Sequence, residues 1–184
     1  MNDPHLHPKA AVSFMAFLQQ YRNDRGALAN LRGALSESRL PRAWPLLGGF
    51  PNAIGDRAYE TVAALWAIDP EADTLAAGNL GDTLRHLVKE HNSFELRFKR
   101  LLTCDAAEIA ERVGPVVRAA LAKGQRVNYT RLLSDLLWWK YERVKIEWAT
   151  AFWGAAEAEA SINPELLDTE DAGAPQPTAG EAAP

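Results

Sequence analysis

Residues 132–153 read LLSDLLWWKYERVKIEWATAFW, and they hold four of the six tryptophans in the chain. At about 100° per residue, five of their apolar side chains fall on one stripe of a helix. The stripe consists of Leu133, Leu137, Val144, Trp148 and Ala151. It predicts one long helix, capped by Asn128 and ending near Trp153.

Three tryptophans lie outside this stripe. Trp138 and Trp139 point well away from its middle, to opposite sides, and Trp153 also lies off it. Trp139 precedes Arg143 by four residues, so an indole and a guanidinium could stack there. Either neighbouring helices of the same bundle cover this extra aromatic surface, or a protein partner or nucleic-acid bases do.

The rest of the chain is also helical in its pattern, because apolar residues recur three and four positions apart and no segment alternates as a strand does. The expected helices lie near 9–22, 26–35, 56–68, 79–90, 93–103 and 105–124. Two interruptions are expected. Residues 39–55 are rich in proline and glycine and should form a loop, and Gly114-Pro115 should break or kink the sixth helix.

This pattern predicts an all-α protein, a compact bundle of about 6–8 helices with a long Trp-rich C-terminal helix. Residues 1–155 would form this helical domain, which could consist of two packed subdomains, about 1–90 and 91–155. Residues 156–184 are rich in Ala, Glu and Pro, so they are predicted to form a disordered acidic tail.

The net charge of −4 conceals a basic region. Residues 157–184 hold seven acids and no Lys or Arg, which leaves 20 basic and 17 acidic residues in 1–156, a net of +3. From Arg97 to Lys145 the balance is 11 basic against 5 acidic residues, or +6. Such an excess is typical of a surface that meets a polyanion, although solvated helix faces produce the same pattern.

A single cysteine, Cys104, allows no internal disulfide and no cysteine-based zinc cluster, which suits a reducing compartment. No apolar run is long enough to span a membrane, and the first residues do not resemble a signal peptide. We therefore expect a soluble protein of the cytoplasm.

Catalysis finds no support in the residue pattern. His86 and His91 are five positions apart, about 140° around a helix, whereas a metal pair needs a shared face. Cys104 has no histidine nearby in sequence to activate it. We expect no enzyme activity, no metal, no cofactor and no small-molecule substrate. A helical hydrolase or metalloenzyme that uses His86 or His91 is kept as an alternative hypothesis.

Several segments occur in an order and at spacings that resemble a known family. They are NLGDTLRHL (79–87), SFELRFKRLLTCD (93–105), the arginine of VVRAAL (116–121) and VNYTRLLSDLLWWKYERVKIEWATAFW (127–153). The start, FMAFLQQYRNDRGALANLRGAL (14–35), is similar as well. Together they resemble the CasB family, the small subunit of the type I-E CRISPR surveillance complex Cascade.

The resemblance implies a non-catalytic, all-helical subunit of a ribonucleoprotein complex for antiviral defence. Such subunits sit as two copies along the inner face of the complex. They contact the backbone and large subunits, the CRISPR RNA, the target DNA strand and the displaced non-target strand, and their basic surface holds the R-loop open. The alternative is a helical protein–protein adaptor without a nucleic-acid role, which predicts basic residues spread around the whole surface.

The resemblance also indicates which residues would bind nucleic acid. The matching basic positions are Arg97, Arg100, Arg118, Arg131, Lys140 and Arg143, with Arg25 and Arg32 from a second cluster in the region of the first two helices. Arg126 is added from the basic run around the sixth helix. Because guanidinium groups fit phosphate oxygens, these residues are expected to bind the backbone without reading the sequence of bases. Trp138, Trp139 and Trp153 are expected at a subunit interface.

Overall fold

The computed structural model describes residues 8–71 and 77–154. Every regular element within these residues is a helix, which confirms the all-α prediction. The acidic tail predicted for 156–184 lies outside the described residues.

The described elements follow the predicted order along the chain. The first half forms α1 (Pro8–Leu18), α2 (Arg25–Arg32), α3 (Trp44–Leu47) and α4 (Arg57–Trp66), with 3₁₀ turns at Gln19–Tyr21, Gly33–Leu35 and Glu37–Arg42. The second half forms α5 (Leu80–Val88), α6 (Ser93–Leu102), α7 (Ile109–Leu121), α8 (Tyr129–Leu137) and α9 (Glu142–Ala149). One π-helical turn, Thr150–Gly154, continues α9.

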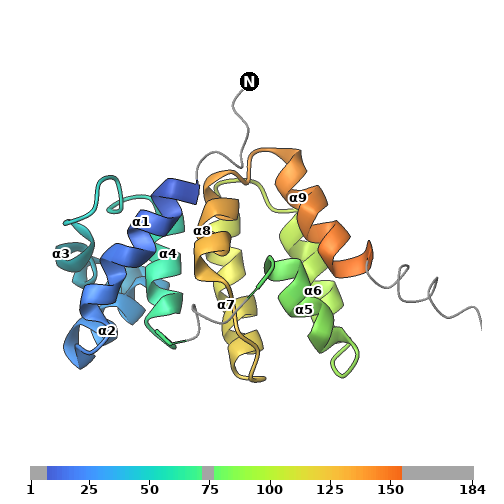
Figure 1. The fold of residues 1–184 in the computed structure, drawn as a ribbon, viewed down its shortest axis with the longest axis horizontal. Coiled ribbons are helices and arrows are strands. Elements are labelled where there is room, and N and C mark those ends of the chain that lie inside the picture. The colour runs from blue at the N-terminus through green and yellow to red at the C-terminus, as the bar shows by residue number, and fades with distance from the viewer. Residues whose placement is uncertain (1–7, 72–76, 155–184) are drawn as a thin grey trace, which may run out of the picture.

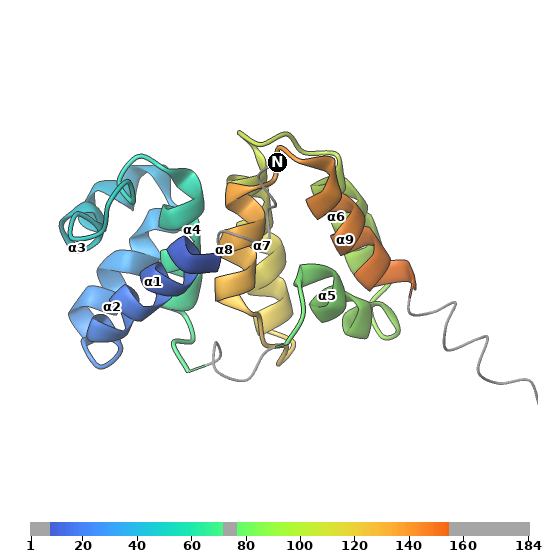
Figure 2. The same ribbon diagram turned by 45° about the horizontal axis from the view of Figure 1, so that its top comes forward.

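The helices form three groups that lie side by side (Figures 1 and 2). The helices α1–α4 lie at one end, α7 and α8 in the middle, and α5, α6 and α9 at the other end. Helix α8 packs against α1 and α4, α7 packs against α4 and α6, and α5 packs against α6 and α9. The division into subdomains near residue 90 stays a prediction, and α5 packs against helices that lie beyond that boundary.

Short polar side chains fix where several helices begin. Asp24, Asp56, Asn79 and Asn128 are N-caps, and each side chain accepts one or two hydrogen bonds from N–H groups in the first turn of its helix. The start predicted at Asn128 is therefore confirmed, as are the starts expected near residues 56 and 79. Gly124 follows α7 with φ of +77°, a conformation that glycine adopts without strain, as expected for the end of that helix.

Residues 39–55 are not a plain loop, because they include the end of a 3₁₀ turn and all of α3. Proline is compatible with the first turn of a helix, and Pro45 lies there in α3. The buried carboxylate of Glu60 holds the segment in place, because it accepts hydrogen bonds from Trp44 Nε1 and from the N–H of Gly55, both at 3.0 Å.

The expected break at Gly114-Pro115 does not occur, because α7 runs through both residues. A side chain before proline normally crowds the proline ring in a helix, and Gly114 has no Cβ to do so. Pro115 lies on the exposed side of α7. The opposite side buries Val113, Val117 and Ala120, and this burial offsets the hydrogen bond that proline cannot donate.

The predicted single helix from Asn128 to Trp153 is also wrong, because residues 138–141 separate α8 from α9. Trp139 lies in this break and is only 1% exposed. Its Nε1 donates to the backbone oxygen of Cys104 at 3.1 Å, and its ring meets Trp148 edge-on with 4.7 Å between centroids. The turn lets both indoles enter the core, which a straight helix with Trp139 off its apolar stripe would prevent.

A buried acid connects α8 to α9. Asp135 accepts hydrogen bonds from Trp148 Nε1 at 2.6 Å and from Arg131 Nε at 2.7 Å. Arg131 also donates to Glu147 at 2.6 Å. Burial raises the pKa of the Asp135 carboxyl above its ordinary value, while the hydrogen bond from Trp148 and the charge of Arg131 limit the rise.

Replacing Trp148 by phenylalanine should lower the free energy of unfolding by about 2–4 kcal/mol, because it removes buried volume and leaves the Asp135 carboxylate without one donor. The matched control is Trp153→Phe at the end of the same segment, where the side chain is 37% exposed. We expect less than about 1 kcal/mol there. Denaturant unfolding followed by fluorescence measures both, and equal losses would contradict this role for Trp148.

Gly81 is the second residue of α5, and a Cβ on it would overlap the backbone carbonyl of Trp148 in α9. Gly81→Ala should therefore destabilise the protein by about 1–3 kcal/mol. Gly26 is the matched control, since it holds the same position in α2 and its N–H also donates to the N-cap side chain. Gly26→Ala should change the melting temperature little, and a Gly81→Ala variant as stable as the parent would contradict this close packing.

Candidate nucleic-acid interface

A groove with a volume of about 820 Å³ runs between α6 and α7. Three arginines line it, Arg97 and Arg100 from α6 and Arg112 from α7. The remaining lining residues are Leu101, Thr103, Cys104, Glu108, Glu111, Pro115 and Val116. We call this cleft the α6–α7 groove. Its three guanidinium groups give it a basic lining that two acids only partly offset.

Helix α6 presents its arginines because its other side is buried. Phe94, Phe98 and Leu101 face the core, so Arg97 and Arg100 lie on the exposed side. The Arg97 guanidinium lies 5.3 Å from the centroid of the Phe94 ring, a cation–π contact that leaves its hydrogen-bond donors available. Within the described residues, no ion pair joins Arg97, Arg100 or Arg112 to a carboxylate.

Arg112 was not among the predicted binding residues. Arg112, Pro115 and Arg118 recur every three residues, and all three lie on the exposed side of α7. This spacing places them along one side only if α7 is continuous. Because a break was expected at Gly114-Pro115, the spacing did not indicate that Arg112 and Arg118 lie on one side of the same helix.

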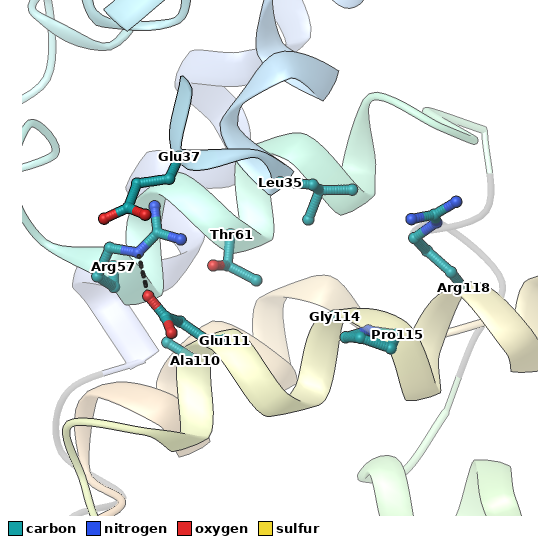
Figure 3. Close-up of a pocket in the computed structure, with 9 residues that line it drawn as sticks. All are labelled: Leu35, Glu37, Arg57, Thr61, Ala110, Glu111, Gly114, Pro115 and Arg118. Atoms are coloured by element: carbon teal, nitrogen blue, oxygen red, sulfur yellow. Dashed lines mark ion pairs between the residues drawn. The ribbon is translucent and has the colours of Figure 1, made fainter. Parts of the chain in front are cut away.

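A second groove, with a volume of about 240 Å³, lies on the other side of α7 (Figure 3). We call it the α4–α7 groove. Its lining residues are Leu35, Glu37, Arg57, Thr61, Ala110, Glu111, Gly114, Pro115 and Arg118. Arg118, a predicted residue, and Arg57, which was missed, lie toward opposite ends of it. Glu111 and Pro115 line both grooves, so α7 forms the ridge between them.

Two of the predicted binding residues are held in ion pairs instead. Arg131 bonds to the buried Asp135 and to Glu147, and Arg143 Nε donates to Glu147 at 2.9 Å. A guanidinium that two carboxylates hold has few donors left for phosphate. The structure therefore favours a stabilising role for Arg131 between α8 and α9.

The other predicted cations are dispersed over the surface. Arg25 and Arg32 lie on α2, where Arg32 Nε donates to the backbone oxygen of Leu28. Arg126 lines a shallow pocket beside His86 and the end of α7. Lys140 lies in the break between α8 and α9, with its Nζ 5.2 Å from the ring centroid of Tyr141. None of these four lines the α6–α7 groove or the α4–α7 groove.

The three predicted interface tryptophans have different surroundings. Trp139 is buried, so the expectation that it meets a partner or stacks on Arg143 is wrong, and the cation above its ring is Lys145. Trp138 is half-buried and stacks on Tyr141 with 5.3 Å between centroids. Trp153 remains partly exposed, with its ring edge-on to Phe98. Tyr141, which is 41% exposed, was missed because its neighbours had been placed within one continuous helix.

The residues considered for catalysis were His86, His91 and Cys104. No cluster of three or more His, Cys, Asp or Glu that could hold a metal occurs in the described residues. Burial raises the pKa of the Cys104 thiol and Glu108 raises it further, while Arg112 and Lys145 lower it. The net rise favours the protonated thiol, which is a poor nucleophile. No helix in the described ranges is long and apolar enough to span a membrane.

Comparisons with solved structures place this arrangement of helices among CRISPR proteins. M. ruber CasB is 28% identical, with a TM-score of 0.68 over 84% of this chain and 98% of that chain. A CRISPR-associated protein of the Cse2 family from Thermus thermophilus is also 28% identical, with a TM-score of 0.66 over 78% of this chain and 97% of that chain. No curated protein matches the chain.

A chain from a structure of a CRISPR RNA-guided surveillance complex shares the fold at 20% identity, with a TM-score of 0.69 over 84% of this chain and 98% of that chain. The family model of CRISPR-associated protein Cse2 matches residues 27–153, which is more than half of the sequence and includes both grooves. The resemblance to CasB is thus confirmed, and the chain belongs to the CRISPR-associated Cse2 family.

Proposed function

We propose that this protein is a non-catalytic subunit of a type I-E CRISPR RNA-guided surveillance complex, Cascade, in the cytoplasm. In this role it contacts the backbones of the CRISPR RNA and the target DNA strand, and it helps to keep the displaced non-target strand apart from them. Membership of the Cse2 family supports the proposal, as does the likeness of its fold to a chain of a surveillance complex.

The observation that carries the proposal is the basic lining of the α6–α7 groove. Arg97, Arg100 and Arg112 converge there from two helices, and no carboxylate of the described residues forms an ion pair with them. Arginine forks bind phosphate oxygens through two parallel hydrogen bonds. The groove therefore suits a nucleic-acid backbone better than it suits a small neutral ligand.

Contacts of this kind are sufficient for the proposed role. In RNA-guided recognition, base pairing with the guide reads the sequence, so the protein needs only to fit shape and charge. Exchange of a DNA duplex for an RNA–DNA heteroduplex is nearly balanced in free energy, so a few phosphate contacts can favour the open state. Binding should be independent of base sequence and should weaken as salt rises.

The partners in this proposal are the backbone and large subunits of the complex and a second copy of the chain. The partly exposed Trp153 and the stacked pair Trp138 and Tyr141 are the aromatic groups available for such contacts. Partly exposed aromatic side chains are enriched in protein interfaces. Trp139 takes no part, because the core covers it.

The helical adaptor without a nucleic-acid role remains the second candidate. Its specific support is the dispersion of Arg25, Arg32, Arg126 and Lys140 away from both grooves. Exposed apolar side chains on the outer helices, Leu96 and Ile146, are also compatible with a protein partner. The convergence of three arginines in one groove favours nucleic acid over this candidate.

Reversing two charges in the groove, Arg97→Glu with Arg100→Glu, should reduce retention of target DNA by the assembled complex about tenfold or more, because two phosphate contacts become repulsive. The dependence of log affinity on log salt should become shallower by about two. Filter binding across a salt series measures both quantities, and circular dichroism checks that the helices remain.

The matched control is Arg25→Glu with Arg32→Glu, which makes the same change in charge on α2, away from both grooves. We expect a smaller loss there. Equal losses in the two double variants would show that net charge matters and that the groove does not, and unchanged retention in the groove variant would count against nucleic-acid binding at this site.

Affinity purification of the tagged protein from its native host, with sequencing of the RNA that accompanies it, tests the assembly directly. We expect repeat-spacer RNA together with several other proteins in fixed proportion, because a subunit of a guide-RNA complex should purify with its guide. Recovery of a protein partner in fixed proportion without RNA would support the adaptor instead.

A further inference from the structure

Arg57, at the start of α4, is held in place from one side by a buried acid. Its Nη1 donates to Glu60 Oε2 at 3.1 Å. Glu60 is itself fixed, because it is fully buried and also accepts hydrogen bonds from Trp44 and Gly55. The Arg57 guanidinium therefore has a set orientation in the wall of the α4–α7 groove.

The Nε of this guanidinium is poorly satisfied. It is covered but makes no hydrogen bond, and the carboxylate oxygen Oε1 of Glu111 lies 3.5 Å away, an ion pair with loose geometry. A buried donor without a partner is rare and calls for an explanation. The Nε side of a guanidinium normally binds a pair of oxygens, as in a carboxylate or a phosphate.

Glu111 is weakly held in this position. Its side chain is 64% exposed, so water screens its attraction to Arg57 and little free energy is lost if it swings away. Figure 3 shows its carboxylate directed at Arg57 from across the groove, with Arg118 farther along the same ridge. Glu111 also lines the α6–α7 groove, so one negative charge faces the arginines of both grooves.

We propose that the α4–α7 groove is a phosphate-binding subsite for a single nucleic-acid strand, and that the Glu111 carboxylate occupies this subsite until a phosphodiester displaces it. Arg57 then binds the incoming phosphate, and Arg118 contacts a neighbouring part of the same strand. Like the Glu111 carboxylate, a phosphodiester presents two oxygens that share one negative charge. The exchange therefore leaves the charge that faces Arg57 unchanged. The inference rests on the proposed function and adds a second contact region across the α7 ridge.

Glu111 would then act as an internal competitor. Any strand that enters must displace it, so weakly held strands are disfavoured relative to strands that the guide fixes in place. Neutralising Glu111 should strengthen binding more than neutralising a nearby acid outside the α4–α7 groove. The first change removes a competitor as well as a charge, whereas the second removes only a charge.

The test measures affinity for a fluorescent single-stranded oligonucleotide of mixed sequence by anisotropy, with the full chain alone and in the assembled complex. Glu111→Gln should bind about fivefold more tightly at low salt. Glu108→Gln is the matched control, since it removes the same charge just before α7 but lines only the α6–α7 groove. We expect about a twofold gain for the control. In an Arg57→Lys background, which keeps a cation beside Glu60, the Glu111→Gln gain should fall to that of the control.

A second readout reports on the subsite without relying on affinity. In ¹⁵N spectra, the Nε–H resonance of Arg57, assigned by its loss in Arg57→Lys, should move downfield when the oligonucleotide binds, because it gains a phosphate acceptor. Equal gains for Glu111→Gln and Glu108→Gln, or an Arg57 resonance that does not move at saturation, would overturn the subsite alone. If neither the chain nor the complex bound the oligonucleotide, the proposed function would fail together with the subsite.

Discussion

The hydrogen bond from Trp148 to the buried Asp135 connects the middle group of helices to the group of α5, α6 and α9. Asp135 belongs to α8, which packs against α1 and α4, and Trp148 belongs to α9, which packs against α5. The chain must turn sharply between them, and the turn is stable because Trp139 fills the core behind it and donates to Cys104. Because water cannot reach a buried carboxylate, the protein must supply its hydrogen-bond donors. Trp148 is one of these donors, so the position of α9 relative to α8 is tightly constrained.

The packing of α7 determines where several basic side chains face. Helix α7 lies between the two end groups and packs against α4 on one side and α6 on the other. Each of these contacts leaves a groove along the exposed side of α7, and arginines from the neighbouring helices line both grooves. The ridge between them contains Glu111 and Pro115, so the two grooves share one acid and one helix.

The arginines divide into two kinds according to what lies beside them. Arg131 is paired with carboxylates that α8 and α9 bring together, and its charge offsets the cost of burying Asp135. Arg97, Arg100 and Arg112 face a groove and form no ion pair with a carboxylate of the described residues. Arg57 combines both situations, because Glu60 holds one side of it and the exposed Glu111 only loosely occupies the other. An anionic ligand can displace the exposed Glu111 carboxylate and bind Arg57 in its place.

The sequence by itself determined the all-α class, the order and approximate bounds of most helices, the cap at Asn128, and the family resemblance, because apolar spacing and capping are local properties. Only the tertiary structure decided that the chain turns at residues 138–141, that Trp139 is buried, and that α7 continues through Pro115. Those outcomes depend on contacts between distant segments, such as Trp139 with Cys104 and Trp148 with Asp135, that outweigh local preference. For the same reason the sequence placed Arg131 and Arg97 in one group, whereas packing against Asp135 separated them.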